Sequence, residues 1–422
     1  MSSVPLVIDL DRALLHCDLA LESVFGLFRE EPLRALTLLA RLAGSRGSVV
    51  RQLERDRQLD VSRLPYNTAV LTLIEAEKAK GRQIVLSSAH YSTYARQIAE
   101  HLRIFDRVVA ASDLGPDGFE RVEPTRSRGG QIAVWAEGMR LHQWIKNVLL
   151  FVPLLTSHRV SDAGSLRDAL FGFVFFGLCA SSVYLLNDLI DLPDDREHPT
   201  KRFRPFASGR ISIAAGLTAV PILLASAFVG AWLLLPPLFT VALGAYYVIT
   251  FIYSFAFKRV MMLDVVTLAV LYTLRIVAGA CAIGGELTFW LLGFSMFIFV
   301  SLALAKRYKE LREASAEGES ASPRGRGYVT ADLGMISALG AASGYLSVMV
   351  LALYIQDPAT AALYRHPRLI WFACPLLLFW VGRTWMITHR GKMHDDPVVF
   401  AITDRVSLLT GALFGLIFSA AA

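Results

Sequence analysis

The sequence predicts an all-α polytopic membrane domain of about nine transmembrane helices, preceded by a small α/β domain. Of the 422 residues, 54% are hydrophobic and only 18% are charged, a balance that is too apolar for a soluble enzyme. Apolar runs of about 20 residues recur after residue 140, and each is long enough to cross a bilayer as a helix. The net charge of +6 is modest, so nucleic-acid binding is not expected.

The first 130 residues have the character of a cytoplasmic α/β domain. Short apolar runs predict strands at 4–10, 83–86 and 107–111. Amphipathic stretches predict helices at 14–28, 32–42, 66–80 and 91–102. Strands that alternate with helices indicate a parallel sheet.

Acids and a serine follow two of these predicted strands. Asp9 and Asp11 end the first strand, and Ser87 follows the second. This arrangement resembles the first two motifs of the haloacid dehalogenase superfamily, in which the first Asp attacks phosphate and the second acts as acid and base. Arg12 and Ala13 replace the family's Gly-Thr pair, and its later lysine and acidic motifs have no clear counterpart. We therefore predict a truncated accessory domain without phosphatase activity; an unrelated fold with acids at a strand end is the alternative.

Residues 140–422 are predicted to form the membrane domain. Its apolar segments are 145–157, 166–186, 212–235, 237–255, 264–283, 288–305, 333–355, 369–388 and 404–421. Lys and Arg gather in the loops after the second, fourth, sixth and eighth segments, whereas the alternate loops are short and nearly uncharged. The positive-inside rule therefore places the basic loops and the N-terminal domain in the cytoplasm.

The loop after the second segment carries Asn187, Asp188, Asp191 and Asp195 between two apolar runs. Acids are costly beside a bilayer, so their presence predicts a functional site. Carboxylate and amide oxygens suit Mg²⁺, which proteins hold with a few carboxylates plus substrate phosphates. Three bases follow that could bind the phosphate charge: Arg196, Lys201 and Arg204. The alternative is a solvated loop whose acids pair with its own bases.

Further candidates lie at the ends of other segments. Those expected to contact substrate or to act in catalysis are Lys146, Asn147, Tyr253, Lys258, Asp264, Arg275, Lys306 and Arg307. Simpler roles are open for some of them: Lys146 as an interfacial anchor, Lys258 as a snorkelling side chain and Asp264 as a helix cap. Arg275 lies inside an apolar segment and should face the bundle interior, paired with an acid or a phosphate.

Together these features resemble the UbiA superfamily of intramembrane prenyltransferases. The acidic motif at 187–195 is the most specific match, and the nine predicted spans agree with the family. Most members carry a second Asp-rich motif after the fourth span, where this chain offers only Tyr253, Lys258 and Asp264. In this departure, and in the stretches at 143–147 and 390–398, the chain resembles the branch of the superfamily that contains decaprenyl-phosphate phosphoribosyltransferase. Some members of this branch also have a dehalogenase-like extension.

The resemblance implies a bacterial inner-membrane enzyme that uses Mg²⁺, phosphoribosyl pyrophosphate and a polyprenyl phosphate. Asp188, Asp191 and Asp195, assisted by Asn187, would hold the metal. The phosphate of the acceptor would contact Lys146, Lys258 and Arg275, and Asp264 would hold a second metal or orient Lys258. The product would feed a lipid-linked arabinose donor for envelope or secreted glycoconjugates, including nodulation signals.

Three points stay open at the level of the sequence. Prenyl transfer to an aromatic acceptor such as 4-hydroxybenzoate is the alternative reaction. A transporter or a membrane anchor is a different class, although acids at helix ends instead of the midplane argue against transport. Assembly into a homo-oligomer is neither required nor excluded.

Overall fold

The computed structural model describes residues 4–28, 31–56, 60–114, 119–122, 130–157, 159–316, 327–358, 362 and 364–421. These residues form two compact units. The first unit comprises Met1–His142 and Ser181–Leu224, and the second comprises Gln143–Ala180 and Ala225–Ala422. The sequence predicts a different division, between an N-terminal α/β domain that ends at residue 130 and a membrane domain that begins at residue 140. This division stays a prediction.

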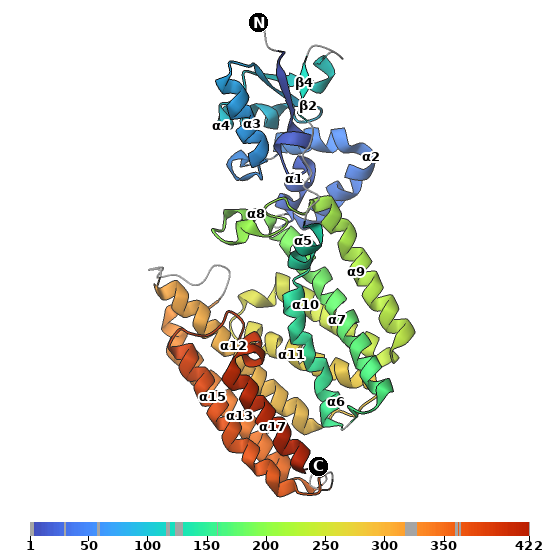
Figure 1. Cartoon of the computed structure of the whole chain (residues 1–422), viewed down its shortest axis with the longest axis vertical. Coiled ribbons are helices and arrows are strands. Elements are labelled where there is room, and N and C mark those ends of the chain that lie inside the picture. Colours follow the sequence, from blue (N-terminus) through green and yellow to red (C-terminus); the bar gives the residue numbers. More distant parts are fainter. Residues whose placement is uncertain are drawn as a thin grey trace. The chain divides into compact units, whose positions relative to one another are not determined.

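A four-stranded sheet forms the centre of the N-terminal part of the first unit (Figure 1). Its strands are β1 (Leu6–Asp9), β2 (Ile84–Ser88), β3 (Arg107–Ala110) and β4 (Glu120–Arg121). They run parallel in the order β3-β2-β1-β4, with Asp9 opposite Ser87. The predicted α/β domain with a parallel sheet is therefore confirmed. The sequence did not indicate β4, because two charged residues give no strand pattern.

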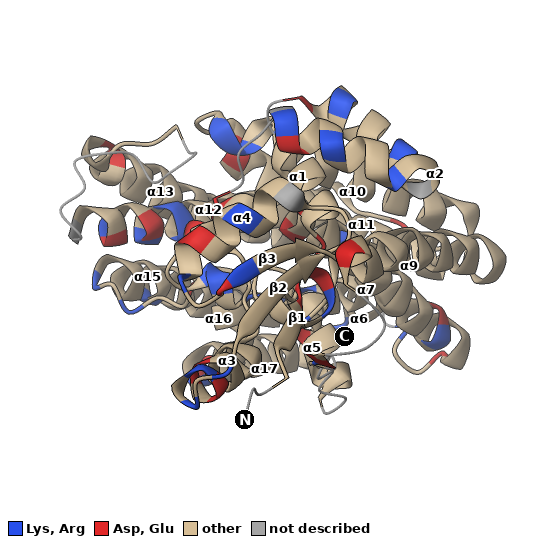
Figure 2. Ribbon diagram, turned by 90° about the horizontal axis from the view of Figure 1, so that it is seen from above, with Lys and Arg blue, Asp and Glu red and all other residues tan. Residues whose placement is uncertain are grey.

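The helices of this part are α1 (Leu19–Leu27), α2 (Pro32–Asp56), α3 (Thr68–Ala79), α4 (Ser92–Leu102) and α5 (Gln131–Gly138). Helix α2 extends well beyond the predicted 32–42 and is kinked at Ser45, whose φ is −145°. Figure 2 shows basic residues recurring along α2, in contrast to α9 (Ile213–Leu234), which carries no charge. The predicted helix 14–28 is shorter because a π-helical turn, Leu10–Leu14, precedes α1.

Seven described helices are long and apolar enough to cross a membrane. They are α7 (Ala163–Ile190), α9, α10 (Pro237–Phe255), α11 (Leu263–Ile283), α12 (Phe289–Ala316), α13 (Leu333–Gln356) and α15 (Ala373–His389). An eighth span results if α16 (Pro397–Thr403) and α17 (Arg405–Ala421), which meet at a 72° bend, count as one. The chain is thus a multi-pass membrane protein with a mostly helical fold, as predicted.

The predicted segment at 145–157 is not among the helices that are long enough to cross a membrane. It folds as a 3₁₀ stretch, Leu141–Phe151, followed by the short helix α6 (Val152–Thr156). Lys146 and Asn147 lie inside this stretch and are buried, so both face the protein interior and not the lipid. The expectation of nine spans is corrected to seven or eight among the described residues.

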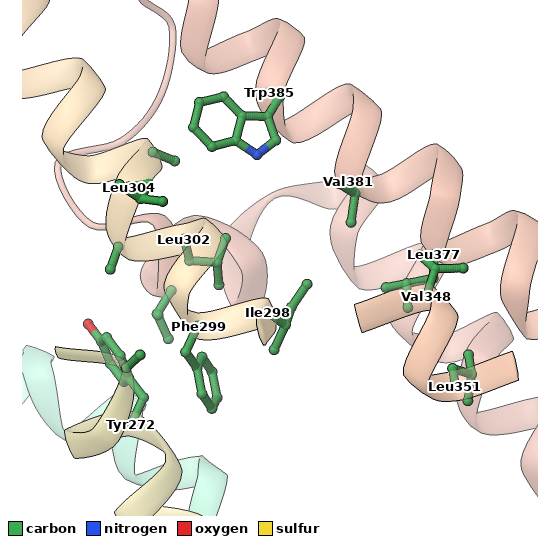
Figure 3. Packing of buried hydrophobic residues seen from close by; sticks show 14 of the residues in the cluster. Tyr272, Ile298, Phe299, Leu302, Leu304, Val348, Leu351, Leu377, Val381 and Trp385 are labelled. Carbon is green, nitrogen blue, oxygen red and sulfur yellow. The ribbon is translucent and has the colours of Figure 1, made fainter. Parts of the chain in front are cut away.

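The core of the second unit is an apolar cluster contributed mainly by α11, α12, α13 and α15 (Figure 3). Ile298 and Leu302 face Val381 and Leu377 across this cluster. The indole Nε1 of Trp385 donates to Ser301 Oγ at 3.0 Å, and Ser301 Oγ donates to the Gly340 carbonyl at 2.7 Å. A Cβ at Gly340 would lie 2.0 Å from Trp385, so only glycine allows this close approach of helices.

Candidate functional site

The acidic motif lies where one helix ends and another begins in the first unit. Helix α7 ends at Ile190, Asp191 is the N-cap of α8 (Leu192–Glu197), and Asp195 lies within α8. Because Asp188, Asp191 and Asp195 are spaced by three and four residues, a nearly continuous helical path turns them to a common side. Leu189 and Leu192, between the acids, are fully buried in an apolar cluster and anchor this segment.

Asp188 and Asp195 are both 3% exposed, and arginines neutralise them. Arg204 Nη1 lies 2.6 Å from Asp195 Oδ2 and 3.3 Å from Asp188 Oδ1, so a single guanidinium joins the two acids. Arg140 forms a second ion pair with Asp188 and stacks over the Tyr184 ring at 5.0 Å. Burial raises the pKa of Asp195, although Arg204 favours its ionised form. The two buried carboxylates therefore share the positive charge of one guanidinium group, that of Arg204.

The bases after the motif take different positions. Lys201 is exposed, yet close enough to Asp195 to favour its ionised state. Arg196 is turned away: its side chain is 5% exposed, Nη1 pairs with Glu22 at 2.5 Å and Nε donates to the Ala207 carbonyl at 3.2 Å. Of the three predicted phosphate-binding bases, the structure brings Arg204 to the acids, leaves Lys201 accessible nearby and commits Arg196 to Glu22.

The donor chemistry of this segment fits Mg²⁺ that enters with a phosphate group. Among the described residues, no three His, Cys, Asp or Glu side chains are grouped closely enough to form a complete protein cage. Magnesium usually needs only one or two carboxylates, with substrate phosphates and water supplying the remaining oxygens. Asp188 and Asp195 provide such a pair, and Asp191 and Asn187 add half-buried oxygen donors on the same segment.

The second unit contains its own buried charges. Lys146 forms an ion pair with Asp396, and both residues are less than a tenth exposed. Asp396 also caps α16, accepting from the Val398 and Val399 amides at 3.0 and 3.3 Å. Burial opposes the ionisation of Asp396, but Lys146 and Lys306 outweigh it and lower the pKa of this carboxyl group. Two predicted lysines thus converge on one acid.

Among the described residues of this unit, Asp264 and Arg307 form the most deeply buried ion pair, at 0% and 1% side-chain exposure. Arg307 Nε donates to Asp264 Oδ2 at 2.6 Å, and Tyr328 Oη donates to Oδ1 at 2.5 Å. Arg307 also donates to Tyr253 Oη at 3.2 Å. The structure therefore joins Asp264 to Arg307 and Tyr328. That Asp264 holds a second metal or orients Lys258, which lies half-buried in the 3₁₀ turn Phe257–Arg259, stays a prediction.

Arg275 is inside the bundle, as predicted, but its described partners are not acids. It donates to Asn147 Oδ1 at 3.2 Å, to the Leu271 carbonyl at 2.7 Å and to Tyr246 Oη at 3.2 Å. Its guanidinium also lies over the rings of Phe176, Tyr246 and Tyr272. These contacts hold Asn147, and with it the neighbouring Lys146, in place. The Nδ2 atom of Asn147 is buried without a hydrogen-bond partner in the described part of the chain.

Four residues of these clusters were not singled out from the sequence: Glu22, Arg140, Tyr328 and Asp396. Arg140 and Glu22 are remote in sequence from the acids and bases that they contact, so no local pattern indicates them. Asp396 stands in the acidic and basic stretch after α15, which was noted, although a role in pairing Lys146 could come only from the tertiary structure.

Comparison with known proteins agrees with this architecture. A structure of a UbiA homologue from Archaeoglobus fulgidus, bound to DMAPP and Mg²⁺, superposes on 68% of this chain and 98% of its own with a TM-score of 0.52 at 17% identity. The model of the UbiA prenyltransferase family matches residues 149–415. The chain belongs to the UbiA prenyltransferase family. It is therefore a membrane-bound transferase of the prenyltransferase type, as the sequence predicted.

Several relatives refine the position of this UbiA chain. The uncharacterised Sinorhizobium fredii protein y4nM is 32% identical over 98% of this chain and 90% of its own length. The nodulation protein NoeC of Azorhizobium caulinodans is 36% identical over 67% of this chain and 92% of its own. Decaprenyl-phosphate phosphoribosyltransferase of Mycobacterium tuberculosis is 29% identical over 67% of this chain and 92% of its own. The predicted resemblance to the phosphoribosyltransferase branch is confirmed, whereas the dehalogenase-like resemblance stays a prediction.

Proposed function

We propose that this protein transfers the 5-phosphoribosyl group from phosphoribosyl pyrophosphate to a polyprenyl phosphate, with Mg²⁺ as cofactor. The observation that carries the proposal is the state of Asp264. Where most UbiA proteins have a second acidic motif, this chain offers one acid, which pairs with Arg307 and accepts a hydrogen bond from Tyr328 Oη. The acidic segment at 187–195 is therefore the group of acids assigned to the metal, while Asp264 shares Arg307 with Glu310. The relatives named as phosphoribosyltransferases support the same choice of donor.

The acidic segment of the first unit suits the pyrophosphate of the donor. Asp188, Asp191 and Asp195, with Asn187, would hold Mg²⁺, which when bound neutralises the charge that develops on the leaving pyrophosphate. Arg204 already lies at the junction of Asp188 and Asp195 and can shift its hydrogen bonds to phosphate oxygens. Lys201, exposed beside Asp195, supplies a second positive charge.

The buried bases of the second unit suit the phosphate of the acceptor. Lys146 and Lys306 converge on Asp396, and Asn147 holds an amide donor without a described partner beside them. Lys258 adds a half-buried charge at the end of α10. The proposal gives Arg275 and Arg307 supporting roles, because their guanidinium groups are occupied by Asn147 and Asp264.

The reaction then needs positioning more than acid–base catalysis. An oxygen of the acceptor phosphate forms a bond to ribose C1 as the bond from C1 to the pyrophosphate oxygen breaks. The electron pair of that bond leaves with the pyrophosphate. Because a phosphate monoester is already anionic near neutral pH, its oxygen attacks without a strong base. The product would be a precursor of a lipid-linked arabinose donor at the bacterial inner membrane, and the N-terminal α/β domain would lie in the cytoplasm. The arabinose donor would serve envelope or secreted glycans such as nodulation signals.

The test is direct. Purified protein, labelled phosphoribosyl pyrophosphate, decaprenyl phosphate and Mg²⁺ should yield a labelled lipid. Asp191→Ala should reduce turnover by at least about 100-fold without changing membrane insertion, because it removes one metal ligand. Asp194→Ala, an exposed neighbour on the same helix, is the matched control and should retain turnover.

Absence of labelled lipid from folded protein would refute the proposal. A second reaction, with a labelled prenyl diphosphate and 4-hydroxybenzoate, distinguishes the aromatic alternative. Product in that reaction and none in the first would show that the acidic segment serves a prenyl diphosphate.

A further inference from the structure

Helix α1 of the N-terminal region packs directly on the acidic segment within the first unit. Leu21 and Phe25 of α1 share one buried apolar cluster with Leu189 and Leu192, the residues that alternate with the acids. Phe206, from the loop after α8, completes this cluster. The N-terminal region therefore forms part of the core on which the acidic segment rests.

An ion pair reinforces this packing. Glu22 of α1 is 6% exposed and its Oε1 lies 2.5 Å from Nη1 of Arg196, the residue that follows Asp195. The Arg196 guanidinium also binds the Ala207 carbonyl, so it connects α1, α8 and the loop after α8. The other oxygen of Glu22 is buried without a hydrogen-bond partner among the described residues. Such an incompletely satisfied buried pair is a poor source of net stability, which favours a role in fixing geometry.

Two contacts extend the junction on either side of this ion pair. Arg63 pairs with Glu197, the last residue of α8. Gly209 has a φ of +73°, and a Cβ there would lie 2.5 Å from the Cβ of His16. Helix α8 has only six residues, and helices this short are not stable by themselves. Its orientation must come from these tertiary contacts.

We propose that Glu22 is a positioning residue for the metal-binding acids: it fixes Arg196 and thereby the orientation of Asp191 and Asp195. This inference rests on the proposed function, which assigns Mg²⁺ to those acids. It also gives the N-terminal region a role that needs no phosphatase chemistry, as a scaffold for the acidic segment.

The experiment uses the full-length protein and Mn²⁺ as a spectroscopic substitute for Mg²⁺. Binding is measured by electron paramagnetic resonance, and the Mg²⁺ concentration for half-maximal turnover is measured in parallel. Glu22→Gln should weaken Mn²⁺ binding about tenfold, since removing groups that orient metal ligands typically has an effect of this size. Glu22→Asp, which keeps the charge but shortens the reach, should have an intermediate effect. Glu77→Gln breaks an ion pair with Arg82 in the same region and should leave binding unchanged.

A double variant separates positioning from stability. In Glu22→Gln/Arg196→Met both charges are gone, so the unfolding midpoint should return toward that of the wild type. Mn²⁺ affinity should nevertheless stay reduced, even though the loss of a nearby positive charge would by itself strengthen cation binding. If Mn²⁺ affinity recovers together with stability, or if Glu22→Gln binds within twofold of Glu77→Gln, the inference is wrong. Wild-type protein that binds no Mn²⁺ would overturn it as well.

The outcomes also separate this inference from the proposed function. Mn²⁺ binding that depends on Glu22, in a protein that transfers no phosphoribosyl group, would refute the function and leave the positioning role intact. If the protein transfers the phosphoribosyl group and Glu22→Gln changes neither metal measurement, the proposed function stands and the positioning role of Glu22 is refuted.

Discussion

Both units bury charged side chains in apolar surroundings, and the examples described above pair with a side chain of opposite charge or form hydrogen bonds with polar groups. Asp396 illustrates the consequence. Its carboxylate pairs with buried Lys146 and lies near Lys306. Removing one member of a buried ion pair leaves the other charge without compensation, which costs more than the pair contributes.

We therefore expect Asp396→Asn to lower the free energy of unfolding by about 3–5 kcal/mol at neutral pH. Because Lys146 and Lys306 lower the pKa of Asp396 in the folded state, its stabilisation is complete above the ordinary aspartate pKa of about 4. It is lost as the pH falls through the lower folded-state pKa. Thermal unfolding of the two proteins between pH 3 and pH 7 should show a difference that shrinks only below about pH 4.

Asp395→Asn is the matched control, since the Asp395 side chain is 90% exposed and its pairing with Lys309 is accessible to water. Its unfolding midpoint should stay close to that of the wild type. An equal loss of stability in both variants would show that the local backbone, and not the buried ion pair, is responsible.

Short elements in this protein depend on their neighbours more than the long helices do. Helix α8 is the clearest case, because the loop after it turns back through Gly209, at a φ of +73° and against His16. Helix α16 is another: Asp404, at the bend to α17, accepts from both Nη atoms of Arg383 at 2.7 and 3.1 Å. In both places a close backbone approach or an ion pair fixes the orientation of a short helix. The apolar pattern of the sequence does not specify that orientation.

Gly209→Ala should disturb the loop after α8 for two reasons, the positive φ and the clash with His16. We expect a loss of at least about 2 kcal/mol in the free energy of unfolding, together with weaker Mn²⁺ binding. Gly81→Ala isolates the first reason, because Gly81 has a φ of +76° and a Cβ added there would meet no described atom within 4 Å. Denaturation curves that coincide for the two variants would contradict a role for the His16 contact.

At the scale of the whole molecule, two acids of the first unit have cationic partners within the chain itself. Because Arg140 and Arg204 neutralise Asp188 and Asp195, we expect folding not to depend on a bound cation. Chelation with EDTA should therefore abolish transferase activity and shift the unfolding midpoint by less than about 2 °C. Added Mg²⁺ should restore turnover. A large drop in the midpoint on chelation would indicate a structural metal instead.

Much of the fold was predictable because apolar periodicity and segment length report directly on burial. Such local patterns predicted the parallel sheet, the long helices and the position of Arg275 inside the helix bundle. The segment at 145–157 has the composition of a span, but the structure divides it between a 3₁₀ stretch and the short helix α6, which the apolar pattern does not indicate. Helix α16 was also missed, because its seven residues are too few to show a helical period, whereas α17 begins next to the predicted start at residue 404.

The sequence by itself determined the class of protein and the acidic segment, since both depend on residue types at short spacing. Only the tertiary structure decided which charges meet. In the tertiary structure Arg196 pairs with Glu22 and not with the acids of its own segment. Asp264 pairs with Arg307, and Lys146 pairs with Asp396. The physical reason is that ion pairs act over a few ångströms between residues that are remote along the chain. Their partners are therefore fixed by packing and burial, which no local pattern encodes.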